Sequence, residues 1–188
     1  MQHPDWDRLF ETAMGQQGLF TTKQAAEAGY SPQLLIHHIR AGNVVRVQRG
    51  IYRLVHFPAG DHEELVAAWL WSEQAGVASH ETALELHQLS DVLPKQLHLT
   101  LPMAWRSRRF RVPRGVVLHY ADVPPEDRTW FAVPTTKPLR TLNDCAQHEI
   151  SPDLLQQAAV EALHRGLVTK AELGVVAEAL KPYGGLAA

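Results

Sequence analysis

The spacing of apolar residues predicts three helices followed by two strands in the N-terminal part of the chain. Apolar side chains recur at helical intervals in residues 5–17, 23–28 and 32–40. Residues 44–47 and 51–55 then alternate as strands do, and a glycine lies in the short segment between them. Two short helices followed directly by a hairpin are the layout of a winged helix-turn-helix, which we predict here.

Residues that favour helix ends support this prediction. Thr21 and Thr22 can cap the second helix through a side-chain oxygen, and Gly29 ends it. Ser31-Pro32 supplies the cap and the first turn of the third helix, which Gly42 ends. We expect the buried face of this helix to consist of Leu35, Ile36 and Ile39.

The pattern changes after residues 56–60, a proline- and glycine-containing segment that is the best candidate for a linker. We therefore predict two domains, residues 1–57 and 61–188. In the second domain, the periodicity predicts helices at 61–74, 80–89, 138–147, 151–165 and 169–180, and strands at 96–101, 116–120 and 129–133. The fold class is α+β, and the second domain is expected to hold a small mixed sheet flanked by helices.

Composition is that of a globular protein able to bury a core. Of the 188 residues, 45% are hydrophobic and 20% are charged. No apolar run approaches the roughly 18 residues of a membrane span, and the N-terminus lacks the pattern of a signal peptide. Cys145 is the single cysteine, so an internal disulfide is excluded. We expect a cytoplasmic protein with no membrane partner.

The net charge of −2 hides two basic segments. Between residues 20 and 57, the cations outnumber a single acid, Glu27, and residues 95–115 contain no acid. Local basic patches on an acidic body can bind phosphates without general stickiness.

The first basic segment supplies groups suited to reading DNA. A recognition helix needs polar side chains on one exposed face, and Gln and Arg make bidentate contacts with adenine and guanine. A basic hairpin suits the neighbouring phosphate backbone or minor groove. The candidate DNA-binding residues are Thr22, Lys23, Gln33, His37, His38, Arg40, Arg46, Gln48, Arg49 and Arg53.

Other interpretations of this segment stay open. A winged helix can serve protein contacts alone, although the arginines of the hairpin argue against that role. His37 and His38 can equally be solvated helix residues. Tyr52 is better interpreted as a core residue beneath the hairpin than as a base-stacking group.

The second basic segment, residues 104–115, lies between two predicted strands. Trp105 and Phe110 are interleaved with its arginines, as in sites that contact phosphates and stack bases. Docking to an acidic partner is one alternative, and a solvated hairpin whose arginines pair with acids of the same domain is another. The arginines are Arg106, Arg108, Arg109, Arg111 and Arg114.

The sequence predicts no catalytic residue, no metal site and no cofactor. His80-Glu81 lacks a second histidine at the spacing of a zinc protease, and His87, His98 and His119 are scattered along the chain. Cys145 is expected to pack in the core, where a neighbouring acid raises a thiol pKa. Asp144 can form a salt bridge with Arg140 or cap a neighbouring element. We expect the second domain to be non-catalytic.

Residues 20–54 resemble the N-terminal domain of the AbiEi family of antitoxins. The most specific part is the run G-x-V-x-R-V-x-R-G-x-Y, residues 42–52, and the resemblance continues more weakly through residues 77–82, the QLHLTLP segment and residues 135–144. These antitoxins are transcriptional regulators of bacterial abortive-infection toxin–antitoxin pairs, described as type IV.

This resemblance implies a repressor of its own operon that binds inverted repeats of operator DNA in several copies, with a monomer in solution as one option. It also implies a C-terminal module that counteracts a nucleotidyltransferase-like toxin, directly or indirectly. Two alternatives stay open: a DNA-directed enzyme with a degenerate nuclease-like domain, and a stand-alone repressor.

Overall fold

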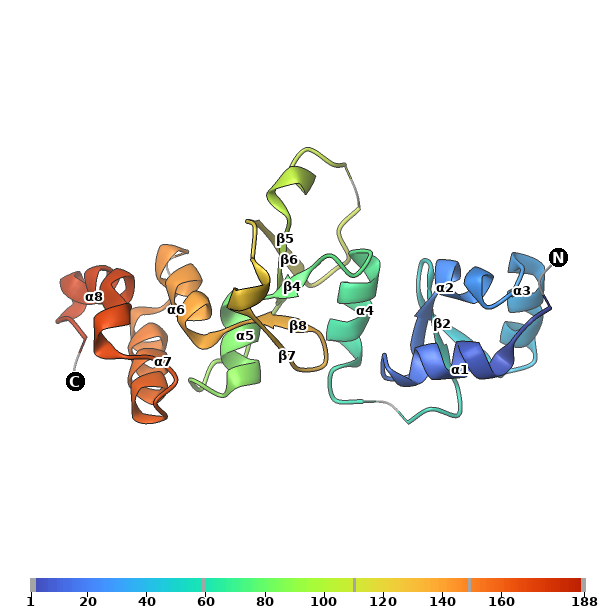
Figure 1. Ribbon diagram of the computed structural model, residues 1–188, viewed down its shortest axis with the longest axis horizontal. Helices are drawn as coiled ribbons and strands as arrows, with labels where there is room; N and C mark the ends of the chain where they lie inside the picture. Colours follow the sequence, from blue (N-terminus) through green and yellow to red (C-terminus); the bar gives the residue numbers. More distant parts are fainter. Residues whose placement is uncertain (1–2, 59, 110, 149, 187–188) are drawn as a thin grey trace. The chain divides into compact units, whose positions relative to one another are not determined.

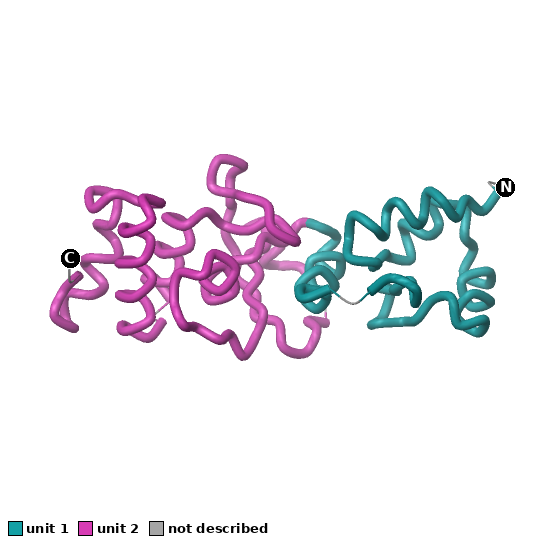
Figure 2. Tube along the Cα trace, turned by 90° about the horizontal axis from the view of Figure 1, so that it is seen from below, with its two compact units in different colours: residues 1–74 teal, residues 75–188 magenta. Residues whose placement is uncertain are grey.

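The computed structural model describes residues 3–58, 60–109, 111–148 and 150–186. The chain divides into two compact units, residues 1–74 and 75–188 (Figure 2). Each unit is described by itself below. The molecule is a mixed α+β protein with two small sheets.

Unit 1 has the element order that the apolar periodicity predicts, with one further strand (Figure 1). The second and third helices begin at the predicted caps, since Thr21 forms a capping box with Gln24 and the Ser31 hydroxyl accepts from the backbone of Leu34. The elements are α1 Trp6–Met14, β1 Leu19–Thr21, α2 Thr22–Glu27, α3 Pro32–Arg40, β2 Val44–Gln48, β3 Ile51–Leu54 and α4 Glu63–Trp71.

The sheet of unit 1 is antiparallel in the order β1-β3-β2. One cluster of buried side chains joins it to α1, α2 and α3, and this cluster includes Leu9, Phe20 and Leu35. Tyr52 packs against the cluster and stacks on the ring of Phe20, as expected of a core residue. Ile36 is 48% exposed, so its predicted place in the core is wrong.

Helix α4 contacts β1 and β3 and belongs to unit 1. The Arg53 guanidinium lies 3.5 Å from the Glu63 carboxylate, and the Gln48 amide donates to the carbonyl of Ala67. The compact units therefore divide after Gln74, later in the chain than residues 57–61. The functional boundary at 57–61 stays a prediction.

Unit 2 holds a five-stranded mixed sheet in the order β6-β5-β4-β8-β7. The sequence misses β4, and a hairpin of β7 and β8 takes the place of the predicted strand 129–133. The elements are β4 Val77–Ala78, α5 His80–His87, β5 Leu97–Leu101, β6 Val116–Tyr120, β7 Arg128–Trp130, β8 Pro134–Thr136, α6 Pro138–Gln147, α7 Pro152–His164 and α8 Gly174–Leu180, with short 3-10 turns at 103–105, 125–127, 170–173 and 181–183.

Two features of unit 2 position its polar groups. Helices α5 to α8 share a core that includes Leu84, Leu142, Leu155 and Leu173. Strands β5 and β6 are parallel neighbours, so residues 102–115 form the crossover that joins them. The second basic segment is thus a crossover connection and not the tip of a hairpin.

Candidate functional site

Helix α3 exposes the polar face that the sequence predicts. Gln33, His37 and Arg40 are all exposed, and their spacings of four and three residues place them on one side of the helix. The exposed Ile36 lies between them in the helical sequence, three residues after Gln33 and four before Arg40. Ile36 therefore adds an apolar group to this face, of the kind that contacts a thymine methyl. The apolar periodicity predicted a buried position for Ile36, so the sequence analysis did not include it among the DNA-binding residues.

The hairpin of β2 and β3 is tied to the start of α2. The backbone amide and the hydroxyl of Thr22 both donate to the carbonyl of Gly50, at 2.9 and 3.3 Å. Gly50 has φ of 80°, which its lack of a side chain permits at this turn. Arg46 and Arg49 are exposed on the hairpin, and Arg46 Nε donates to the Gln48 carbonyl.

An open groove of about 480 Å³ follows this junction. Lys23 and Arg49 line it together with Thr22 and Gly50, so two cations lie at its margin. The exposed Lys23 is 4.0 Å from Glu27, a pair whose stabilising effect in water is small. Glu27 and Glu73 also line the groove, so its charges balance. Lys23, Arg49 and the N-terminal end of α2 are the groups in it that favour a phosphate.

Three predicted DNA-binding residues are engaged within unit 1. The His38 ring lies 5.5 Å from the rings of both Trp6 and Tyr30. Gln48 and Arg53 contact α4 through Ala67 and Glu63, as described above. His38, Gln48 and Arg53 are therefore half-buried, whereas the other seven predicted DNA-binding residues are exposed.

The arginines of the second basic segment are exposed. The Arg108 guanidinium lies 3.8 Å from the centre of the Trp105 ring, a cation–π contact that anchors the loop. Within the part of the chain that the structure describes, Arg106, Arg109, Arg111 and Arg114 form no ion pair. This gives no support to pairing with acids of the same domain. Phe110 lies outside the described residues.

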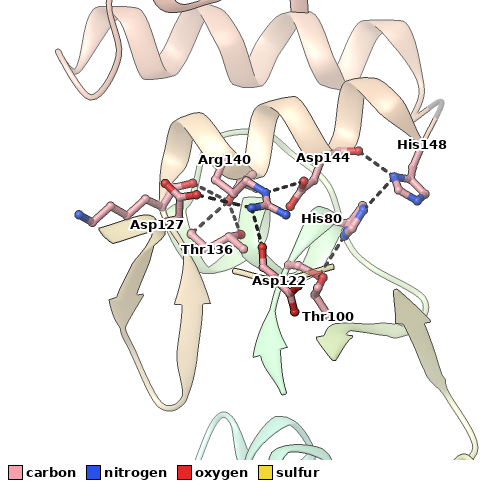
Figure 3. A network of polar contacts seen from close by, with 11 residues as sticks. His80, Thr100, Asp122, Asp127, Thr136, Arg140, Asp144 and His148 are labelled. Carbon is pink, nitrogen blue, oxygen red and sulfur yellow. Dashed lines mark hydrogen bonds and ion pairs between the residues drawn. The ribbon is translucent and has the colours of Figure 1, made fainter. Parts of the chain in front are cut away.

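Unit 2 also contains a polar network that the sequence predicts only in part (Figure 3). Arg140 Nε donates to Asp144 at 2.8 Å, which confirms the predicted salt bridge, and Arg140 also reaches Asp127. Burial raises the pKa of Asp144, although the hydrogen bond from Arg140 opposes this. Cys145 is buried, and burial raises the pKa of its thiol, as expected of a core cysteine.

The histidines that look scattered in the sequence are gathered beside this network. His80 and His119 stack with ring centres 3.6 Å apart, and His148 and His98 adjoin them. Burial, followed by the neighbouring imidazoles, lowers the pKa of His80 to about 2 and that of His119 to about 4. Both are therefore neutral at pH 7, with an unprotonated ring nitrogen. Sequence spacing missed this cluster, whose members come from four separate elements or their ends.

Residues 7–55 match the profile of a family described as a transcriptional regulator, AbiEi antitoxin. The match runs from α1 to the end of the hairpin and confirms the resemblance of residues 20–54. The weaker resemblance at residues 77–82, in the QLHLTLP segment and at residues 135–144 lies outside the match and stays a prediction. No curated protein shows a significant match to the chain. Among the described helices, none combines the length and apolar character needed to cross a membrane.

Proposed function

Taking the AbiEi match of residues 7–55 as the premise, we propose that this protein represses transcription of its own operon as the antitoxin of a toxin–antitoxin pair. Its N-terminal part is a winged helix-turn-helix that binds double-stranded operator DNA. The observation that carries this proposal is the exposed polar face of α3 beside an exposed basic hairpin. Such a role places the protein in the cytoplasm.

The proposed division of labour follows from the chemistry of the side chains. Gln33, Ile36 and Arg40 of α3 read base edges in the major groove, where amide, guanidinium and apolar groups distinguish the bases. Lys23, Arg46 and Arg49 contact phosphates and set the register of the protein on the duplex. Because Gln48 and Arg53 are held by α4, we assign them to support of the hairpin.

The C-terminal part, in this proposal, counteracts a nucleotidyltransferase-like toxin and carries out no catalysis. The exposed arginines of residues 104–115 either extend the DNA contact or meet the acidic surface of a partner. If these arginines contact DNA, substituting them lowers the affinity for the operator. If they contact a partner protein, the affinity for the operator is unchanged.

A binding experiment with two classes of variant tests the DNA proposal. We expect Arg46→Ala with Arg49→Ala to weaken binding to all sequences and to reduce the salt dependence, by about 0.9 in the log–log slope for each phosphate that is no longer neutralised. Gln33→Ala and Arg40→Ala are expected to relax base preference, at about 1–3 kcal/mol for one position. Fluorescence anisotropy on the upstream region of the gene, at two salt concentrations, measures both effects.

Lys170→Ala is the matched control, because it removes an exposed cation from unit 2 outside both basic segments. It is expected to leave operator affinity unchanged. Unchanged operator binding by the combined Gln33, Arg40, Arg46 and Arg49 variant, with its fold intact by circular dichroism, would contradict the proposal.

A further inference from the structure

The histidine cluster of unit 2 has the arrangement of a metal site. One ring nitrogen from each of His80, His119 and His148 lies within 4.8 Å of the other two. His80 Nε2 and His148 Nδ1 are 3.1 Å apart. Ligands of a tetrahedral zinc ion at 2.0–2.1 Å lie about 3.3 Å from one another. This pair is therefore close to ligand spacing, and the third nitrogen has to move closer for all three to bind one ion. His148 Nδ1 also lies 3.1 Å from the Asp144 carbonyl, an acceptor, so metal binding at this nitrogen requires its proton to move to Nε2.

We propose that His80, His119 and His148 bind a divalent transition-metal ion of the zinc class. This site goes beyond the proposed DNA-binding function, which resides in unit 1. The three ligands come from the first residue of α5, from strand β6 and from the residue that follows α6. A bound ion would therefore link the sheet of unit 2 to two of its helices.

The surroundings of the cluster orient its rings as outer-shell groups do. His80 Nδ1 lies 2.9 Å from the Ser79 hydroxyl, which also accepts from Thr100 at 2.8 Å (Figure 3). If His80 Nδ1 carries the proton and donates to Ser79, Nε2 is left free to bind a metal. His98 Nδ1 lies 3.0 Å from His119 Nε2, so we assign His98 as a positioning residue.

The backbone conformation of His80 is a second unusual feature. Its φ of 51° is left-handed, which costs a residue other than glycine about 1–3 kcal/mol. His80 shares this conformation with Gln17, Glu73, Gln74 and Gln88, so the proposal rests on the geometry of the rings and not on this φ.

The charges around the cluster favour a cation. His148 follows the C-terminal end of α6, the negative end of the helix dipole. Asp144, one turn earlier, has a buried Oδ2 atom with no hydrogen-bond partner among the described residues. Glu81 is 4.0 Å from His98. Two carboxylates thus adjoin the cluster: Glu81 beside His98, and Asp144, whose other oxygen pairs with Arg140.

The donor set decides the class of metal. Imidazole suits zinc, copper, nickel and iron, whereas magnesium and calcium require oxygen ligands. His80 is buried, His119 is half-buried and His148 is exposed, so an ion can enter from the side of His148. Three protein ligands leave a fourth position for water or for a further group.

Metal titration of the full chain, prepared without a histidine tag and stripped with a chelator, tests the site. We expect one Co²⁺ per chain with visible absorption typical of tetrahedral coordination, displacement of Co²⁺ by Zn²⁺, and no response to Mg²⁺. His119→Gln and His148→Gln should each weaken Zn²⁺ binding by more than about 10-fold, the smallest loss typical of outer-shell changes. Zn²⁺ should also raise the melting temperature of the wild type more than that of these variants.

His164→Gln is the matched control, because it makes the same change at an exposed histidine at the end of α7. It is expected to bind Zn²⁺ as the wild type does. His148 is exposed, so its variant should fold even if His80→Gln does not. Failure of the wild type to take up Co²⁺ or Zn²⁺, or wild-type affinity in a folded His148→Gln protein, would overturn the proposal.

Discussion

Protonation of His87 on α5 makes the stability of the protein depend on pH. Its side chain is buried, and Nε2 lies 2.7 Å from the carbonyl of Thr136, an acceptor that requires a proton on this nitrogen. Burial lowers the pKa of His87, as does the charge of Arg165, while the hydrogen bond to Thr136 opposes the shift. The folded protein therefore resists a second proton on this ring.

The sign of the pH dependence follows from linkage. An unfolded histidine titrates near pH 6.5, so below that pH the unfolded chain binds a proton that the folded chain refuses. We expect the free energy of unfolding to be highest above pH 6.5 and to fall with decreasing pH, by at most about 1.4 kcal/mol per pH unit from this residue. His87→Gln keeps a donor for Thr136 without titrating. Urea denaturation of both proteins from pH 7.5 to 5 should show a smaller loss in the variant, and parallel curves would contradict this account.

Single residues also show where sequence reasoning stops. Ile36 fits the apolar spacing of α3, yet the side of the helix that meets the core carries Leu35 and Ile39, and Ile36 remains exposed. The metal cluster is harder to foresee, because His80 and His148 are joined only through the fold of unit 2. The sequence offers His80 at a predicted helix start and two histidines, His98 and His119, in consecutive predicted strands. Periodicity cannot reveal such a site, because it contains no information on which strands are neighbours.

At the scale of elements, the turn between α2 and α3 depends on Gly29. Its φ is 86°, and a Cβ atom added there would lie 2.6 Å from the carbonyl oxygen of His3. Gly29→Ala should therefore destabilise the protein by about 1–3 kcal/mol from backbone strain alone, with the clash adding to it. Gly42→Ala is the matched control, since Gly42 has φ of 75° but open space around it. Thermal or urea denaturation should show a lower stability for Gly29→Ala than for Gly42→Ala. Equal losses of stability in the two variants would show that the contact with His3 is unimportant.

Helices and strands were predicted more accurately when they were long and when residues that favour helix ends marked their limits. The capping side chains of Thr21 and Ser31 fixed the starts of α2 and α3 to within a residue, and β6 and α6 have their predicted bounds. Strands β1, β4 and β8 are only two or three residues long, too short to show a period of two. Their place in the sheets comes from pairing with distant strands, which local sequence does not specify.

At the scale of the whole molecule, the role of α4 predicts which fragment of the N-terminal part is stable. Leu19 is fully buried and lies opposite Arg53 in the sheet, on the side where Arg53 reaches Glu63 of α4. A fragment of residues 1–57 loses this cover, and exposing one leucine costs about 1.5–3 kcal/mol. We expect residues 1–74 to unfold cooperatively and at a higher temperature than residues 1–57. Equal melting temperatures by circular dichroism would place α4 outside the folding unit.

The parallel pairing of β5 and β6 has a consequence for how residues 102–115 can change. To begin a parallel strand beside β5, the chain must return by the length of one strand, about 16 Å. Residues 102–115, fully extended, would reach roughly twice that distance or more. The surplus is what lets the loop project from the sheet (Figure 1). Substitution of its arginines should thus be tolerated by the scaffold, whereas trimming it to a tight turn would forbid the strand order. Evolution can therefore change the residues of this loop, whereas deletions are limited by the number of residues that the crossover needs.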